Sequence, residues 1–298
     1  MRRKKSSILV ITLFILFFLS ILSLSLGYSL RLKINLLKRR RDRLLTFYML
    51  KGALNMVVED LEKDKKESAF DSFDEEIFSK YKDSLDFYGP HGDVKGSYRV
   101  YITDEEARLN INTASGESFR KFLDNFNVDS KELSEKIFNY RENKKDKLFY
   151  TPYELLMVEG IENNIFYGDD LNEDGVLEEW EDKDKDNKFD KGIKDFITVY
   201  GDGKININSA SLEVLESMKG SSLKIAKEII DKRPFKSREE LKDKLNLSSE
   251  ELKNILTWAK VKSDYFRIVI TVRNKKTFRE ILAIVDRSAS KIVYFRSL

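Results

Sequence analysis

The chain has 298 residues, of which 41% are hydrophobic and 35% charged, and its formal net charge is +3. It contains no cysteine and one histidine, which excludes disulfides, thiolate metal sites and cysteine nucleophiles and argues against a catalytic triad. We therefore expect no enzyme, but a chain long enough for two ordinary domains and a membrane segment.

The first predicted element is an apolar helix over residues 8–27, preceded by a basic leader, residues 1–7. Residues 8–26 carry no charge, and about 20 such residues span a hydrocarbon core roughly 30 Å thick. The segment is long for a secretory signal and no small-x-small cleavage site follows, so we expect it to remain as a membrane anchor. A basic run from Arg31 to Arg43 follows, and such a collar suits anionic lipid headgroups.

The orientation of this anchor has two opposing indications. Four Lys or Arg residues precede the apolar segment, and seven lie within the sixteen residues after it. The positive-inside rule alone would keep the carboxyl side in the cytoplasm, although long domains are translocated largely regardless of charge.

The helix is predicted to continue as the spine of a soluble domain, because no proline occurs before Pro90. Its apolar residues recur three or four positions apart and form one face that must be buried: Leu44, Phe47, Leu50, Leu54, Val57 and Leu61. Residues 60–82 are charged and are predicted to be irregular, and residues 88–93 read as a turn.

Alternating apolar residues predict four strands, over residues 97–103, 265–273, 278–286 and 291–295. They form a mainly antiparallel sheet with a hairpin turn at Asn274, and helix 44–61 covers its apolar face. The predicted fold class is α+β, in which residues 28–104 and 263–298 form one domain. Residues 105–262 are then a large, all-α inserted domain.

The insertion contains a repeat. Leu109–Ser115 reads LNINTAS and Ile205–Ser211 reads ININSAS, and a glutamate and an apolar helical stripe follow each. We expect Thr113 and Ser209 to be helix N-caps. In each copy a second helix follows, which ends at Arg141 in the first copy and at Arg233 in the second, before a Phe-x-Ser/Thr-type motif. The match extends over about 40 residues per copy and predicts two related helical modules.

Between the modules, residues 169–195 contain twelve carboxylates against five lysines. Asp170 to Glu181 fits the twelve-residue calcium-loop pattern at each required position, and a second run follows at once. The predicted ligands are Asp170, Asn172, Asp174, the Val176 carbonyl and Glu181, then Asp182, Asp184, Asp186, Lys188 and Asp190. We expect at least one calcium ion here, which would fold the loop; the alternative is a solvated acidic loop.

A second functional hypothesis concerns nucleic acid. The repeated motif, two helices and residues 234–241 resemble the helix-hairpin-helix modules of DNA-uptake proteins, which hold phosphate through backbone amides of a glycine-rich hairpin. Here the hairpins are residues 125–129 and 219–223, and only Gly220 remains of the glycines. Residues 204–262 form no basic stripe, which argues against nucleic acid as a partner.

Together these elements resemble general secretion pathway protein K, the large minor pseudopilin of type II secretion systems. The resemblance includes the apolar helix, Asp104–Ser115, the acidic run, Val199–Ser211 and the closing segment from Asp264. It implies a pilin-like domain carrying a helical insertion of the sterile-alpha-motif-like type, with calcium beside it. Members of that family are thought to cap the pseudopilus tip with two other minor pseudopilins and to prime its assembly.

The resemblance also implies processing and location. A prepilin peptidase would cut between Ser7 and Ile8, although Ser7 stands where that family has glycine. Thr12 would then be the fifth mature residue, where ordinary pilins carry glutamate. We expect an inner-membrane protein with its soluble domain in the periplasm, in contact with other minor pseudopilins, the secretion platform and the lipid bilayer. A related type IV pilus machinery and a membrane-anchored DNA-binding protein remain the alternatives.

Overall fold

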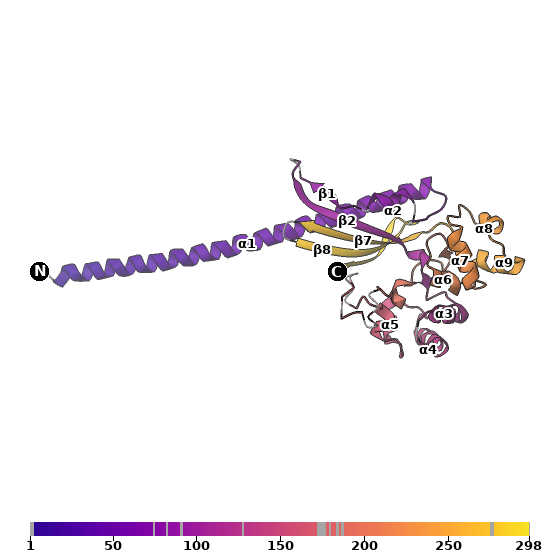
Figure 1. Ribbon diagram of the computed structural model, residues 1–298. Coiled ribbons are helices and arrows are strands. Elements are labelled where there is room, and N and C mark those ends of the chain that lie inside the picture. Colours follow the sequence, from indigo (N-terminus) through magenta and orange to yellow (C-terminus); the bar gives the residue numbers. More distant parts are fainter. Residues whose placement is uncertain are drawn as a thin grey trace.

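A computed structural model describes residues 3–73, 75–81, 83–89, 92–126, 128–171, 177–178, 180–182, 185, 188–274 and 277–297. Its longest element is helix α1 (Arg3–Glu67), which at 1.5 Å per residue is about 98 Å long. Figure 1 shows its first half projecting alone and its second half lying along a sheet. Within the described residues, α1 is the one helix apolar and long enough to cross a membrane, and its apolar stretch is not buried.

The helix continues further than expected, to Glu67, and a short helix, α2 (Glu76–Lys80), follows. Residues 60–82 are thus more regular than their charges predicted. Leu61, the last residue of the predicted stripe, is buried, and Tyr81 is buried as well and donates its hydroxyl hydrogen to the Asp60 carboxylate. The buried apolar positions outweigh the high charge of this stretch.

The sheet has five antiparallel strands in the order β1-β2-β7-β8-β9. The strands are β1 (Leu85–Tyr88), β2 (Val94–Asp104), β7 (Tyr265–Asn274), β8 (Thr277–Asp286) and β9 (Lys291–Ser297). The four predicted strands are confirmed, with β2 pairing with β7 through Val100 opposite Ile270. The fifth, β1, is a correction: it has only four residues and forms a hairpin with β2.

One face of the sheet packs on α1, as predicted. The buried cluster unites Met49, Leu50, Ala53, Leu54, Val57 and Leu61 of the helix with alternate residues of β2, β7 and β8, such as Val100, Ile268 and Ile281. The stripe is shorter at its start than expected, because Leu44 is 57% and Phe47 53% exposed. The covered part of α1 already includes Leu45, which packs against this cluster, and Thr46, which is fully buried, so Leu44 and Phe47 lie outside the buried face of the helix.

The residues between β2 and β7 form a second body with its own hydrophobic core, built from small helices at the end of the molecule remote from the N-terminus (Figure 1). Its first part contains η1 (Glu105–Ala107), β3 (Leu109–Asn110), α3 (Gly116–Leu123), α4 (Ser130–Asn143), η2 (Pro152–Met157) and α5 (Asn163–Tyr167). The second contains η3 (Ile193–Asp195), β4 (Ile197–Thr198), β5 (Ile205–Asn206), α6 (Leu212–Ser217), α7 (Leu223–Asp231), α8 (Glu239–Lys244), α9 (Ser249–Trp258) and β6 (Ala259–Lys260). The predicted α+β class with a helical insertion is therefore confirmed.

A buried arginine joins the end of α1 to the sheet. Arg287, just after β8, is 1% exposed and donates to Asp71 from two nitrogens (2.9 and 2.7 Å) and to Asp64 from Nη1 (2.8 Å). It also donates to the Ser263 carbonyl, and the Ser263 amide donates to Asp71 at 2.5 Å. We refer to Asp64, Asp71, Ser263 and Arg287 as the Arg287 clasp. Asp64, Asp71 and Glu75 form a compact acidic group, with one carboxylate oxygen of each within 4.8 Å of the others, and Arg287 supplies its counter-charge.

Three consecutive carboxylates, Asp104, Glu105 and Glu106, hold the entry of the insertion against its exit; we call them the acidic junction. All three are buried. Asp104 accepts from Asn206 (2.7 Å), Ser209 and Ser263 (2.8 Å). Burial would raise the pKa of Glu105, but Arg267 and Arg108 outweigh it and hold that pKa below its usual range. Charges buried in this way are tolerated only when they are paired.

Glu105 and Glu106 bind different segments of the chain. Glu105 accepts from Arg267 at 2.8 and 3.0 Å and from the Thr198 hydroxyl at 2.8 Å. Glu106 pairs with Lys260 and accepts the amide hydrogen of Asp264 at 2.6 Å. The acidic junction therefore connects β7 to both ends of the inserted body.

The Arg287 clasp predicts a pH dependence of stability. Burial and the neighbouring Asp71 carboxylate raise the pKa of Asp64 from 3.8 to about 6. Below pH 3.8 the carboxyl is protonated in both the folded and the unfolded state. Between pH 3.8 and about 6 it stays protonated in the folded state but is ionised in the unfolded state, so the free energy of unfolding decreases as the pH rises to about 6. Asp64→Asn removes this titration while keeping an acceptor for Arg287.

We expect the free energy of unfolding of Asp64→Asn, relative to wild type, to increase from pH 4 to pH 6 and to level off above. Chemical denaturation of the full chain in detergent at a series of pH values measures it. Glu59→Gln, an exposed position on the same helix, is the matched control and should show no such change. A pH-independent difference for Asp64→Asn would contradict the assignment.

Candidate functional site

The acidic loop between the modules has a closed base. Gly168 and Lys191 form an antiparallel bridge, the Asp169 amide donates to the Asp190 carbonyl, and the Asp190 amide donates to the Asp169 carboxylate, each at 2.9 Å. Two glycines permit this approach: a Cβ on Gly192 would lie 2.3 Å from the Gly168 nitrogen. The two ends of the loop are thereby held side by side.

Glu181, the predicted bidentate ligand, is fully buried and turned into the loop. Its Oε1 accepts the amide hydrogen of Leu171 at 2.9 Å and its Oε2 that of Glu178 at 3.4 Å. The twelfth position of the loop thus folds back onto the backbone of the second position, near the start of the loop, as a calcium loop requires. Asp170, at the first position, receives a hydrogen bond from Lys194 on Oδ2 (3.1 Å), and this lysine also lies over the Tyr167 ring.

Three of the other predicted ligands lie within the described residues, and five do not. Asp182 is buried next to Glu181, whereas Lys188 and Asp190 are exposed at the closing end of the loop. Asn172, Asp174, Val176, Asp184 and Asp186 lie outside the described residues. The structure therefore places Glu181, the twelfth position of the first loop, against the backbone of the second position, Leu171, while Asp170 at the first position bonds Lys194.

The repeated Asn-x-Asn motif builds the same framework in both modules. Asn112 donates to the Phe149 carbonyl (2.9 Å) and accepts from the Phe149 amide (2.8 Å). Asn208 makes the same pair with Phe235, both at 2.8 Å. In each motif the first asparagine accepts the backbone amide of the second, at 2.9 and 3.1 Å. The asparagines thus bind the module's own backbone.

The arginine at the end of the second helix of each module completes this framework. Arg141 donates to the carbonyls of Ile111 (3.2 Å) and Asn112 (3.0 Å). Arg233 donates to the carbonyls of Ile207 and Ala210. Burial lowers the pKa of Arg233 to about 10, which leaves it charged at neutral pH. Neither arginine is therefore displayed for a phosphate partner.

The predicted N-caps are wrong by two residues. Ser115 is the N-cap of α3 and accepts the Ser118 amide at 3.1 Å, and Ser211 occupies the N-cap position of α6 without a side-chain bond. Thr113 instead closes a turn onto the Asn110 carbonyl, and Ser209 donates to Asp104. The Asn-x-Asn turn continues through these positions, so each helix begins later.

The hairpin between α6 and α7 is packed rather than open. Gly220 has φ +82, and a Cβ there would lie 2.5 Å from Cβ of Asn254 on α9. The Ser221 amide donates to the Met218 carbonyl within the turn, and Ser221 is buried. In phosphate-binding hairpins these amides face the ligand, whereas here the turn lies against its own domain.

The membrane-proximal features lie on α1. Ile8 begins the exposed apolar stretch, and Ser7 belongs to the same helix, although its side chain lies outside the described part. Thr12 donates its hydroxyl hydrogen to the Leu9 carbonyl at 2.9 Å, so it is satisfied within the helix. A threonine at this point therefore adds no unpaired polar group to an apolar surface.

Known proteins resemble the chain in two ways. Residues 201–259 match the helix-hairpin-helix motif family. No curated protein sequence matches the chain significantly. Among solved structures, the fold is similar to a chain of the GspK-GspI-GspJ complex from the type 2 secretion system of enterotoxigenic Escherichia coli. The TM-score is 0.63 at 10% sequence identity, and the similarity covers 88% of this chain and 98% of that chain. The resemblance expected from the sequence is confirmed at the level of the fold, which is that of a GspK-like minor pseudopilin.

The Asn-x-Asn framework predicts a structural role for the repeated motif. Asn208→Ala leaves the buried amide and carbonyl of Phe235 without partners, and we expect the free energy of unfolding to fall by about 1–3 kcal/mol. Asn139→Ala, on an exposed face of α4, is the control and should change it by less than about 0.5 kcal/mol. Thermal or denaturant unfolding of the full chain measures both. Equal effects at the two positions would contradict the structural role.

Proposed function

We propose that this chain is a minor pseudopilin of a type II secretion system or a related type IV pilus-like system, and that it initiates and caps pseudopilus assembly at the tip. One observation carries the proposal: a single unbroken helix runs from a membrane-length apolar segment into the spine of an antiparallel sheet, and a large helical body interrupts that sheet. The similarity to a chain of the GspK-GspI-GspJ complex supports it.

The shape of the molecule suits a terminal position. The exposed apolar residues of α1 provide a surface for lipid before assembly and for neighbouring helices within a filament. The inserted body lies at the opposite end, where it widens the molecule beyond the sheet (Figure 1). A subunit with that bulk has little room for a further subunit above it, which favours a cap over an internal filament position.

This function defines the partners. The chain would be anchored in the inner membrane with its domains in the periplasm, and would contact other minor pseudopilins and the secretion platform. A prepilin peptidase would cleave between Ser7 and Ile8. A DNA-binding role is less well supported, because Arg141, Arg233 and the Gly220 hairpin are engaged within their own modules.

Calcium binding in the acidic loop belongs to the same proposal. Glu181, buried with both carboxylate oxygens directed at the loop backbone, and Asp170, beside the closed base, would provide ligands together with the intervening residues. A bound cation would offset the repulsion among the twelve carboxylates of residues 169–195. Its effect would be stability of the inserted body, since an ion bound only by the folded state stabilises that state.

The calcium proposal predicts a ligand-dependent stability. At a calcium concentration about 100 times the dissociation constant, the free energy of unfolding should rise by about 2.7 kcal/mol, and a chelator should reverse the gain. Glu181→Gln should lose most of this gain, whereas Glu159→Gln, 91% exposed in its side chain and outside the loop, should keep it. Calorimetric titration and thermal unfolding of the full chain measure binding and stability. Equal stability in calcium and chelator would contradict the proposal.

The assembly role predicts a loss of secretion. Removing the gene in the native host should abolish export of the secreted proteins and formation of pseudopilus filaments when the major subunit is overproduced. The full chain should restore both, and a chain lacking residues 1–27 should restore neither, because the anchor is missing. Secretion assays and electron microscopy read these outcomes. Normal secretion and filaments without the gene would refute the proposed function.

A further inference from the structure

Lys194, in η3, places its ammonium group at the start of the acidic loop. Its Nζ donates to the Asp170 carboxylate oxygen Oδ2 at 3.1 Å and to the Asp170 carbonyl oxygen at 3.2 Å. The same nitrogen lies 4.9 Å from the centre of the Tyr167 ring, where the π face attracts a cation. Groups of residues 167–170 therefore bind this one positive charge from more than one side.

The contact between Lys194 and Asp170 is largely removed from water. The two side chains are 11% and 14% exposed. Charges buried to this extent are screened less by solvent and salt than charges on the surface. A carboxylate in such a place is stable only with a counter-charge, and the Lys194 ammonium provides one when no metal ion is bound.

Calcium would use the same carboxylate. Asp170 is the first position of the proposed calcium loop, and calcium lies about 2.3–2.6 Å from its oxygen ligands. An ion on Asp170 Oδ2 would therefore lie within about 6 Å of Nζ if the lysine kept its position. Two cations at that separation in a partly buried site repel one another strongly. The ammonium and the calcium ion thus compete for Asp170.

A cavity beside Lys194 has room for the displaced ammonium. It has a volume of about 190 Å³, and its lining includes Lys194 itself and the carboxylates of Asp170, Asp195 and Glu280. An ammonium group needs roughly the space of one water molecule, about 30 Å³. The flexible four-carbon stem of a lysine allows such a movement. Asp195 is already close enough to Lys194 for the two charges to interact.

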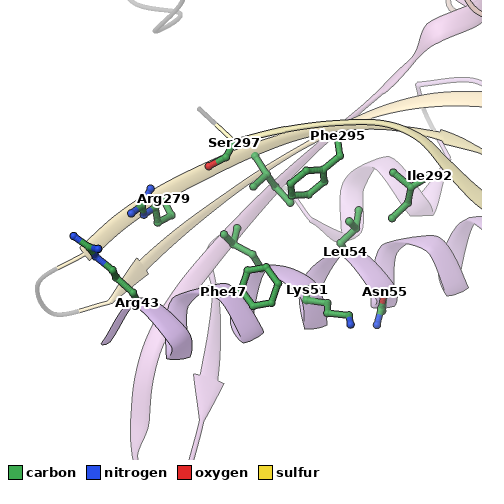
Figure 2. Close-up of a pocket in the computed structure, with 11 residues that line it drawn as sticks. Arg43, Phe47, Lys51, Leu54, Asn55, Arg279, Ile292, Phe295 and Ser297 are labelled. Carbon is green, nitrogen blue, oxygen red and sulfur yellow. The ribbon is translucent and has the colours of Figure 1, made fainter. Parts of the chain in front are cut away.

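The lining of this cavity differs from that of the larger groove between α1 and β9. That groove has a volume of about 520 Å³, no described residue of its lining is acidic, and its charged side chains are all cationic (Figure 2): Arg43, Lys51 and Arg279. The cavity beside Lys194 also contains two arginines, but Arg267 is paired with Glu105 and Arg296 donates to the Tyr153 hydroxyl at 3.2 Å. A displaced ammonium would meet carboxylates here, whereas the groove would repel it.

We propose that Lys194 is the internal counter-ion of the acidic loop, and that calcium binds by exchanging with its ammonium at Asp170. The proposal rests on the calcium site of the proposed function and adds what sets the affinity of that site. Without calcium, the ammonium holds the start of the loop. With calcium, it moves into the adjacent cavity, toward Asp195 and Glu280. Because the ion must displace a charge already in place, the loop binds calcium more weakly than its carboxylates alone would.

The test compares calcium binding by variants of the full chain in detergent. Lys194→Met and Lys194→Gln both remove the charge, and the glutamine keeps a hydrogen-bond donor for Asp170. Lys194→Arg keeps the charge. Lys191→Met, at an exposed position close to the loop, is the matched control for the loss of one positive charge. Calorimetric titration with calcium chloride measures the dissociation constants, and thermal unfolding in chelator and in saturating calcium measures Tm.

We expect Lys194→Met and Lys194→Gln to bind calcium at least about tenfold more tightly than wild type, and Lys191→Met to differ by less than about twofold, because an exposed charge is screened. Lys194→Arg should bind no more tightly than wild type, since a guanidinium also pairs with the carboxylate. In chelator the two neutral variants should have a lower Tm than wild type. In saturating calcium this difference should disappear, because the affinity gained equals the stability lost without the ion.

The outcomes separate this proposal from the calcium site itself. Equal affinities of wild type and the neutral variants would refute the exchange and leave the calcium site standing. Weaker binding by the neutral variants would make Lys194 a residue that positions Asp170 for the ion, and would also overturn the proposal. Tighter binding by Lys194→Arg would assign the effect to packing instead of charge, with the same result. No binding by wild type or by either neutral variant would refute both the calcium site and the exchange, and would leave the assembly role unaffected.

Discussion

The architecture depends on ionic groups that are buried and mutually paired where the two bodies meet. Arg287 connects the end of α1 to the exit of the insertion, and the acidic junction connects the entry of the insertion to β7. A buried arginine or carboxylate without its partner is strongly destabilising, whereas the pair together is tolerated. The inserted body and the sheet have separate apolar clusters, so the cost of separating these ionic partners holds the inserted body against the sheet. Ser263 belongs to both groups, since it bonds Asp71 and Asp104.

The two modules share the same local arrangement of strand, turn and helices. Each has a two-residue strand, an Asn-x-Asn turn, two helices and an arginine that returns to the turn. Parallel pairs β3–β4 and β5–β6 place the two turns in equivalent settings. The copies differ in their first asparagine: Asn110 donates to carbonyls of residues 200 and 201, whereas Asn206 donates to Asp71, Asp104 and Ser263. The second module thus holds the inserted body to the sheet, while the first closes that body on itself.

Apolar periodicity predicted the helix spine and four strands, because the spacing of apolar residues shows which face is buried, and the recurring Asn-x-Asn motif predicted the repeat within the insertion. Other features have no such signal. The Asp-Glu-Glu of the acidic junction carries no local pattern that indicates burial, because its partners Arg267 and Lys260 lie more than 150 residues later in the chain. The same holds for Asp71 and Arg287. Thr113 and Ser209 matched the N-cap pattern, but the turn before them was not predictable from helix rules, and β1 was too short to show alternation.

The closeness of the insertion's two ends has a mechanical consequence. Asp104 and Ser263 are joined by a hydrogen bond, so the chain leaves and re-enters the sheet at one point. A pull along the axis of α1 is transmitted in shear to β7 and β8 through interlocked side chains and the Arg287 clasp, and it bypasses the helical body. The inserted body then bears no load, so its size and surface can vary while α1 and the sheet carry the tension.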